Sequence, residues 1–292
     1  MSAAIPDDDQ PDGQPDEQPE PRSRYDEMAA GYARFWAPVL REAAERVLDH
    51  LAPYLDGARR GAELLDVGTG TGTLAIAALD RWPGVRVTGI DPSGGMLEVA
   101  GASAAERLPA AAQRRFRRRV APADRMPFRD GSFDAAMSSF VLQLVPSRAA
   151  ALREIRRVLR PGGVAAWVSW QRTNRAFEPD RLANEVLDDF GFDPPEPDAR
   201  SGDIASPRSA AETMRRAGFR EVRAWLGECT YAWDAEGYLA FLTDFDEQSL
   251  FDELERGERA EIEAAILERL ERLAPDELTL RLPIVYAMGA AG

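Results

Sequence analysis

The sequence has no lysine, one cysteine and one histidine, and each shortage excludes a class of chemistry. All 36 basic residues are arginines, which excludes a Schiff-base enzyme, a pyridoxal-phosphate enzyme and a phosphate-loop lysine. The single cysteine, Cys229, excludes an internal disulfide and a cysteine-cluster metal site. The single histidine, His50, excludes paired-histidine zinc. Carboxylate-only magnesium or calcium sites stay open, but no EF-hand loop is visible, and we predict no metal.

The chain also lacks a long apolar run and a positive net charge. No window reaches the ~18 apolar residues of a membrane span, and no basic-then-apolar leader opens the sequence. We therefore expect a cytoplasmic protein without a membrane span. A net charge of −14 disfavours a nucleic-acid partner, because neutralising phosphates requires a basic face. The basic run 114–119 has only Phe116 as an interleaved aromatic, and we interpret it as a solvated strand flank. Nothing in the sequence indicates an oligomeric state.

Composition divides the chain into a tail and one domain. Residues 1–24 contain seven acidic residues and five prolines. Such a segment buries too little apolar surface to offset its ordering entropy, so we predict a disordered acidic tail. Residues 25–292 then form a single domain, because a chain of this length suits one large α/β domain with appended helices.

Short apolar runs alternate with helical patterns along that domain. The alternation predicts an α/β fold with a seven-stranded, mainly parallel sheet that helices cover on both faces. An apolar helix carrying Val39 to Leu51 is expected to end before Pro53. Strands are expected at 63–67, 85–90, 116–120, 133–140, 164–170, 221–233 and 278–288. Further helices are expected at 70–81, 93–107, 147–160, 181–190, 206–217, 235–245 and 256–273.

A glycine-rich turn follows the first predicted strand and opens the next helix. Its glycines, Gly68, Gly70 and Gly72, permit a tight bend and let a ligand approach bare backbone. A dinucleotide fingerprint has its third glycine three residues after the second, where this chain has Thr73. The spacing therefore disfavours a nicotinamide or flavin cofactor.

Two carboxylates flank this turn. Asp66 lies just before it, where a carboxylate repels a pyrophosphate and attracts an ammonium or a sulfonium. Asp91 ends the second predicted strand, about twenty residues past the glycines, where it can accept hydrogen bonds from both hydroxyls of a ribose. Together the two residues indicate a nucleoside with a cationic tail.

With these residues in place, the sequence resembles the class I S-adenosylmethionine-dependent methyltransferases, in particular the small-molecule group (UbiE-like, methyltransferase type 11). The resemblance covers about residues 25–232. It implies a Rossmann-like fold with helical cap insertions, S-adenosylmethionine as cofactor and methyl transfer to a small acceptor. It rests on four motifs in order, LLDVGTGTG (64–72), VTGIDPSGGML (87–97), MPFRDGSFD (126–134) and REIRRVLRPGG (153–163).

The resemblance also implies a division of the domain and a set of cofactor contacts. Residues 25–60 would be lid helices, 61–170 the cofactor core, and 171–205 and 234–275 cap insertions over the acceptor site. Asp66 would neighbour the methionine amino group and Asp91 the ribose. The remaining implied contacts are Gly68, Thr69, Gly70 and Gly72 along the methionine and adenosine, Pro92 and Met96 against the adenine, and Ser139 at a strand end nearby. Some of these residues have alternative interpretations: a solvated carboxylate or helix cap for Asp66 and Asp91, helix packing for Met96 and sheet packing for Ser139.

One departure concerns the adenine. Relatives commonly have an aspartate where this chain has Pro122, and that aspartate accepts from the adenine amino group. Proline has neither a side-chain acceptor nor a backbone N–H. We therefore expect either Asp124 or the Ala123 N–H to replace this contact, with cofactor binding weakened but retained.

Methyl transfer from a sulfonium depends on alignment and exclusion of water, so a catalytic base is optional, and we name no catalytic residue. His50 lies near the end of its helix, where we interpret it as interacting with the helix dipole. Gln143 follows the fourth strand and is predicted to orient the acceptor. Aromatic residues of the lid, Tyr25, Tyr32 and Trp36, would shield the sulfonium or simply pack in the core.

The aromatic content of the two insertions suggests a largely apolar or aromatic acceptor, methylated on O, N or C. Two other functions stay open. One is a binding protein or non-methylating enzyme that retains S-adenosylmethionine, since a fold does not fix a reaction. The other is a nicotinamide oxidoreductase, which the glycine spacing and Asp66 disfavour.

Overall fold

The computed structural model describes residues 21–57, 61–192 and 202–292. Most of the predicted acidic tail, residues 1–20, lies outside the described residues. Residues 21–24 correct the predicted boundary, because helix α1 (Pro21–Gly31) already includes them. Proline is favoured in the first turn of a helix, where its missing N–H has no partner to lose.

Seven strands form one sheet in the order β3-β2-β1-β4-β5-β7-β6, which confirms the predicted α/β architecture. The first five pair in parallel, and β7 is antiparallel to both β5 and β6. The strands are β1 (Glu63–Val67), β2 (Arg86–Asp91), β3 (Phe116–Val120), β4 (Phe133–Ser139), β5 (Leu159–Trp170), β6 (Phe219–Ala232) and β7 (Thr279–Ala291).

Helices cover both faces of the sheet, and the two-residue period of the strands divides the core accordingly. Leu64 of β1 packs in the apolar cluster shared with α2 (Ala37–Leu55) and α3 (Thr73–Arg81). Its neighbour Leu65 packs in the opposite cluster, with α6 (Arg148–Val158) and α8 (Pro207–Arg216). Helix α4 (Gly94–Arg107) follows β2, and the short α5 (Ala110–Gln113) precedes β3.

The basic run lies on β3, the edge strand of the sheet. Arg115 donates to the main-chain carbonyls of Leu79, Trp82 and Val85 at 2.6–3.1 Å. Arg118 donates to the Leu97 carbonyl at 2.7 Å. Arg115 therefore bonds carbonyls at the end of α3 and in the turn after it, and Arg118 bonds the first turn of α4.

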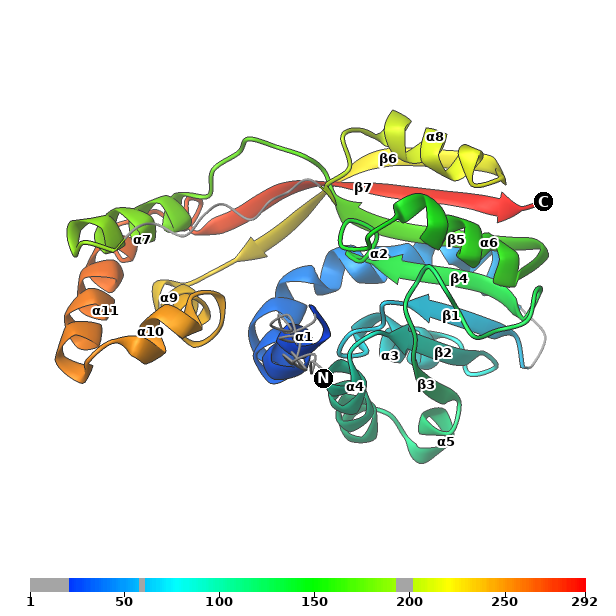
Figure 1. Cartoon of the computed structure of the whole chain (residues 1–292), viewed down its shortest axis with the longest axis horizontal. Helices are drawn as coiled ribbons and strands as arrows, with labels where there is room; N and C mark the ends of the chain where they lie inside the picture. Colours follow the sequence, from blue (N-terminus) through cyan, green and yellow to red (C-terminus); the bar gives the residue numbers. More distant parts are fainter. Residues whose placement is uncertain (1–20, 58–60, 193–201) are drawn as a thin grey trace, which may run out of the picture.

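The last two strands extend beyond the rest of the sheet and carry a helical cap (Figure 1). Pairing between β5 and β7 ends at Trp170 and Ile284, whereas β6 and β7 stay paired as far as Ala232 and Thr279. Residues of the two predicted insertions share one apolar cluster, although residues 193–201 of the first lie outside the described part. The cap contains α7 (Glu178–Asp189), α9 (Ala235–Phe241), η3 (Leu242–Asp246), α10 (Gln248–Glu253) and α11 (Arg256–Leu270).

Several element boundaries differ from the prediction. Helix α2 continues to Leu55 with Pro53 inside its last turn, because a proline near a helix end interrupts few backbone bonds. Helix α3 begins at Thr73 instead of residue 70, since the glycine turn precedes it. Strand β5 begins at Leu159, five residues early. The short helices α5 and α10 and the two π-helical turns, η1 (Tyr32–Trp36) and η3, were not predicted.

No helix in the described part of the chain is long and apolar enough to cross a membrane. Within those same residues, no three His, Cys, Asp or Glu side chains are grouped as a metal site would require.

Candidate active site

Asp66 is the penultimate residue of β1, and its carboxyl group is buried. Because side chains alternate along a strand, Asp66 lies on the same face as Leu64, toward α2 and α3. It is 1% exposed. Its Oδ2 accepts a hydrogen bond from Thr69 Oγ1 at 2.7 Å, whereas Oδ1 is buried and has no hydrogen-bond partner among the described residues. Burial raises the pKa of Asp66 to about 7.

The turn after β1 needs glycine for two different reasons. Gly68 has a φ of 68°, and a Cβ there would lie 2.2 Å from Val141, so both backbone conformation and space require glycine. Gly72 has a φ of 86° and is the N-cap of α3. A Cβ on Gly72 would lie 3.1 Å from Ala100 Cβ of α4. The structure thus places Gly72 where α3 packs on α4, and its predicted contact with the cofactor stays a prediction.

Asp91 ends β2 and is bonded to both the turn and α4. Its Oδ2 accepts from the Gly70 N–H at 3.0 Å, and its Oδ1 accepts from the Ser93 N–H at 3.0 Å. Burial also raises the pKa of Asp91. Each oxygen of an ionised carboxylate has two acceptor positions, so Asp91 keeps capacity for ligand hydroxyls. The parallel pairing of β1 with β2 brings this carboxylate to the same sheet edge as Asp66.

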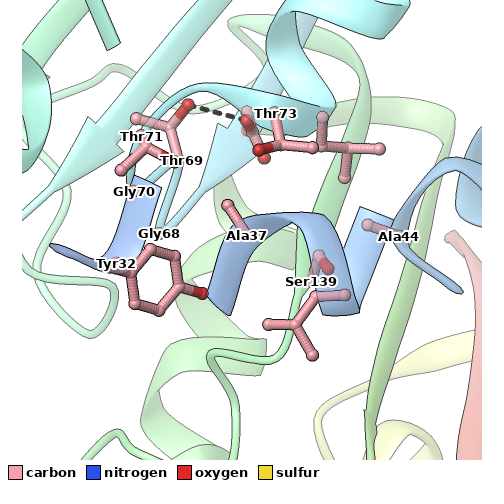
Figure 2. A pocket seen from close by; sticks show the side chains of 12 residues that line it. Tyr32, Ala37, Ala44, Gly68, Thr69, Gly70, Thr71, Thr73 and Ser139 are labelled. Atoms are coloured by element: carbon pink, nitrogen blue, oxygen red, sulfur yellow. Dashed lines mark hydrogen bonds between the residues drawn. The ribbon is translucent and has the colours of Figure 1, made fainter. Parts of the chain in front are cut away.

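A pocket lies between the glycine turn and the N-terminal helices. Figure 2 shows Tyr32 and Ala37 on one side and the turn on the other, with Ser139 at the end of β4. Six of its residues were predicted from the sequence as site residues. The other six come from the apolar face of α2 and from the threonine-rich start of α3, which the sequence indicated only as core and turn. The lining residues are Tyr32, Ala37, Leu40, Ala44, Asp66, Gly68, Thr69, Gly70, Thr71, Thr73, Leu74 and Ser139.

The lid aromatics occupy different positions. Tyr32 lines the pocket, and burial, with Tyr25 and Asp91 nearby, raises the pKa of its phenol well above the usual range. Trp36 instead stacks against Trp170 at 6.3 Å and Phe241 at 5.6 Å between ring centroids. The structure therefore brings Tyr32 to the predicted cofactor site and places Trp36 between the core and the cap.

The residues predicted for the adenine lie beside Asp91. The Ala121 N–H donates to the Asp91 carbonyl at 3.0 Å, so the segment after β3 follows the end of β2. Ala123 is buried in the core cluster, and Asp124 is half-buried. Pro92 is exposed, and Met96 is buried in the first turn of α4. The roles of these residues remain predictions.

Both the nitrogen and the oxygen of the Gln143 side-chain amide form hydrogen bonds within the protein. Its Nε2 donates to the Phe140 carbonyl at 2.7 Å, and its Oε1 accepts from Ser169 Oγ at 2.7 Å. Phe140 has a φ of 54°, which is strained for a bulky residue. Its ring lies 4.6 Å from that of Trp170. Gln143 therefore supports a strained loop next to Trp170 at the end of β5.

His50 is remote from the pocket lining. Its ring packs against Trp225 at 4.4 Å and Tyr286 at 5.4 Å between centroids, and burial lowers its pKa. The predicted dipole interaction is wrong in detail, because α2 continues five residues past His50. Cys229 is a buried residue of β6, and burial raises the pKa of its thiol to about 12.

The pocket fits a cationic nucleoside better than a diphosphate. A buried carboxylate oxygen without a partner costs free energy that a nearby ammonium offsets. The described lining residues include Asp66 and no basic side chain, so a diphosphate would meet repulsion there. Asp91, at the same end of the sheet, is an acceptor of the kind that ribose hydroxyls need, and its contact with a ribose stays a prediction.

Comparison with known proteins matches the part of the chain that contains this pocket. Residues 65–167 match the family model described as a methyltransferase domain. This region is a methyltransferase domain similar to those of the class I S-adenosylmethionine-dependent methyltransferases. The cofactor is S-adenosylmethionine, and the methyltransferase domain includes Asp66, the glycine turn and Asp91.

Relatives of this methyltransferase differ in how much of it they match. The ubiquinone/menaquinone biosynthesis C-methyltransferase UbiE of Paracoccus denitrificans is 42% identical over 147 residues, 48% of this chain and 52% of that protein. The chain thus spans about half the length of the first curated relatives it matches. Nocamycin O-methyltransferase of Saccharothrix syringae is 28% identical over 282 residues, 91% of this chain and 96% of that protein.

A solved structure shares the fold of this methyltransferase. The YcgJ protein of Bacillus subtilis superposes with a TM-score of 0.55 at 18% identity, covering 84% of this chain and 98% of that one. At this identity the likeness concerns the fold alone.

Proposed function

We propose that this methyltransferase transfers the methyl group of S-adenosylmethionine to an oxygen of a small, largely apolar acceptor. The observation that carries the proposal is the Oδ1 atom of Asp66, which is buried and has no hydrogen-bond partner among the described residues. Asp66 lines the pocket together with Tyr32, and Asp91 ends the neighbouring strand β2. The bound cofactor supplies an electrophilic methyl group on a sulfonium. What the protein adds is alignment and exclusion of water.

The residues divide this work as follows. Asp66 attracts the cofactor's ammonium, Asp91 accepts from its ribose, and the Gly68–Gly70 backbone lets it approach closely. Tyr32 covers the pocket from the lid. In this proposal residues 25–60 are the lid, residues 61–170 the cofactor core, and residues 171–205 and 234–275 the cap over the acceptor site. The other proposed contacts are Thr69, Gly72, Pro92, Met96, Ala123, Asp124 and Ser139, with Tyr25 and Trp36 nearby in the lid.

Aromatic rings extend from the end of β4 toward the cap and favour an apolar acceptor. Phe140 contacts Trp170, Trp170 contacts Trp36, and Trp36 stacks on Phe241, with centroid separations of 4.6, 6.3 and 5.6 Å. Flat apolar molecules bind well along such rings. The full-length likeness to an O-methyltransferase of nocamycin supports oxygen as the methylated atom.

The acceptor hydroxyl is proposed to ionise without a base from the cofactor pocket. The titratable side chains among the described lining residues are Asp66 and Tyr32. Asp66 is engaged with the cofactor's cation, and the raised pKa of Tyr32 keeps its phenol protonated at neutral pH. A phenol, an enol or a carboxylic acid meets this requirement, whereas an aliphatic alcohol needs a base.

Two measurements test the proposal. Calorimetry with S-adenosylmethionine, S-adenosylhomocysteine and NAD is expected to show binding of the first two alone, and binding of NAD alone would overturn it. Incubation with methyl-deuterated cofactor and a library of phenols, carboxylic acids, amines and aliphatic alcohols is expected to label phenols or acids. Labelling confined to amines or to carbon would correct the acceptor atom. Cofactor binding without any labelled product would favour a non-methylating enzyme.

A further inference from the structure

The end of the N-terminal region touches both the cofactor core and the cap (Figure 1). We call residues 25–36, from the second half of α1 and all of η1, the bridging segment. Helix α1 contacts α4 on one side and η3 of the cap on the other. The segment is thus placed to transmit a change at one site to the other.

On the core side, Asp26 anchors the segment to the start of α4. It accepts hydrogen bonds from Ser93 Oγ at 2.5 Å and from the Gly95 N–H at 2.8 Å. The backbones are in contact, because a Cβ on Gly95 would lie 2.8 Å from the Asp26 carbonyl oxygen. The Ser93 N–H in turn donates to Asp91 Oδ1 at 3.0 Å. Only one residue therefore separates Asp26 from the carboxylate proposed to hold the ribose.

On the cap side, Phe245 of η3 anchors the same segment. Its ring fills the space left by Gly31, where a Cβ would lie 2.7 Å from Phe245 Cδ2. The ring also contacts Tyr32 edge-on at 6.4 Å and stacks near Phe35 at 6.3 Å between centroids. Tyr32 and Phe245 each lie in a π-helical turn, a feature frequent at functional sites.

Tyr32 follows Asp26 in the bridging segment, contacts Phe245 and lines the cofactor pocket. Its position over the pocket therefore depends on Phe245 as well as on Asp26. Phe245 belongs to the cap and is not among the residues that line that pocket.

We infer that Phe245 is a positioning residue for the cofactor: seated against Gly31, it holds the bridging segment, and Tyr32 with it, over the cofactor pocket. This inference rests on the proposed function of that pocket. Since coupling between sites is reciprocal, cofactor binding also strengthens the docking of the cap on the segment. The cap helps to form the acceptor site, so this site becomes most rigid once the cofactor has bound.

The test measures the Kd of S-adenosylhomocysteine by calorimetry in wild type, Phe245→Ala and a control, Phe251→Ala. Phe245→Ala is expected to raise the Kd by about 5-fold to about 150-fold, the usual span of coupling between sites. Phe251 is more deeply buried, at 1% against 9% exposure, and its ring contacts the Arg259 guanidinium. The control is expected to change the Kd by less than about twofold.

Either of two outcomes would overturn the inference. One is an unchanged Kd in Phe245→Ala. The other is an equal loss in Phe251→Ala, because general loosening of the cap would then explain both. If wild type itself fails to bind S-adenosylhomocysteine, the proposed function fails instead, so the two failures are distinguishable.

A second variant covers the case in which Phe245→Ala does not fold. Gly31 has a φ of −61° and ψ of −44°, which suits alanine in a helix, so Gly31→Ala displaces the Phe245 ring without straining the backbone. It is expected to raise the Kd in the same direction. In the double variant Asp26→Ala/Phe245→Ala, the losses are expected to be less than multiplicative, because both release one segment. Fully multiplicative losses would mean independent anchors and would overturn the inference.

Discussion

The backbone N–H of Gly70 donates to Oδ2 of Asp91 at 3.0 Å. This bond joins the turn after β1 to the end of β2, so the two strand ends present one surface to a ligand. Asp91 thereby both shapes the turn and keeps acceptor positions for ribose hydroxyls. Its substitution should cost more than the ligand bonds alone.

We predict that Asp91→Ala abolishes measurable affinity for S-adenosylmethionine. Two hydrogen bonds to a charged group contribute about 1.5–3 kcal/mol each, so the Kd should rise about 10²-fold to about 10⁴-fold. Asp91→Asn keeps one acceptor oxygen and should lose less. Calorimetry measures the affinities, and circular dichroism confirms that the variants fold. A Kd for Asp91→Ala within about threefold of wild type would contradict the assignment.

Cofactor affinity should depend on pH through Asp66. The carboxylate form attracts the cofactor's cation, and the pKa of Asp66 is raised to about 7 in the unliganded protein. Below that pH a proton must leave before binding, so the Kd should rise as the pH falls below about 7 and level off above it. Calorimetry of wild type and Asp66→Asn over the same pH range isolates this effect, since titration of the ligand is common to both. Parallel pH profiles would contradict the prediction.

The same group should reduce the stability of the unliganded protein at higher pH. The folded-state pKa is raised from 3.8 to about 7, so between these values the folded protein holds a proton that the unfolded chain has lost. The free energy of unfolding should therefore fall as the pH rises through this window, by up to about 1.4 kcal/mol per pH unit. Asp66→Asn should remove this decline and be the more stable protein at pH 8 in urea unfolding. Equal slopes for the two proteins would refute the prediction.

The sequence predicted the sheet well because buried strands are short continuous apolar runs with clear ends. The bounds of β1 and β3 match the prediction, and Asp66 and Asp91 lie at the sheet edge where strand order placed them. Local spacing does not reveal contacts between distant segments. Gly31 and Phe245 are far apart in the sequence but lie in contact in the structure, and this contact depends on how β6 and β7 position the cap.

The sequence also did not predict which apolar side chains line the pocket and which only pack in the core. Leu40 and Ala44 have the spacing of core residues, yet they line the pocket because α2 crosses above Asp66. Gly72 belongs to the family motif, and its packing against Ala100 of α4 is a second role that the motif does not reveal. Such roles depend on which neighbour a side chain meets, and a single sequence does not specify that.

His50→Ala should leave turnover within about threefold of wild type, an effect under about 1 kcal/mol on the barrier. The imidazole packs between Trp225 and Tyr286, away from the pocket, so its removal leaves a cavity there and lowers stability. Turnover at saturating cofactor and thermal unfolding of the same preparation separate the two effects. A collapse of turnover in a folded His50→Ala protein would show that the reaction uses a histidine base.

The last prediction concerns Gln143 as a support for the acceptor site. Phe140 is in the left-handed region, which costs a non-glycine residue about 1–3 kcal/mol, and the Gln143 amide is one of the bonds that hold it there. Gln143→Ala leaves the Phe140 carbonyl and the Ser169 hydroxyl without these partners. Two such bonds contribute about 0.5–1.5 kcal/mol each, so stability should fall by about 1–3 kcal/mol.

The distinctive effect should be on the acceptor. If Phe140 relaxes, its ring leaves Trp170, so the KM for the acceptor should rise while the Kd of S-adenosylmethionine stays within about threefold. Leu144→Ala, in the same loop at a 59% exposed position, serves as the control and should change neither quantity. Gln143→Glu keeps an acceptor for Ser169 but loses the donor to Phe140, so it should resemble Gln143→Ala if the Phe140 bond matters. Equal losses of acceptor and cofactor affinity in Gln143→Ala would instead indicate general loosening of the sheet edge.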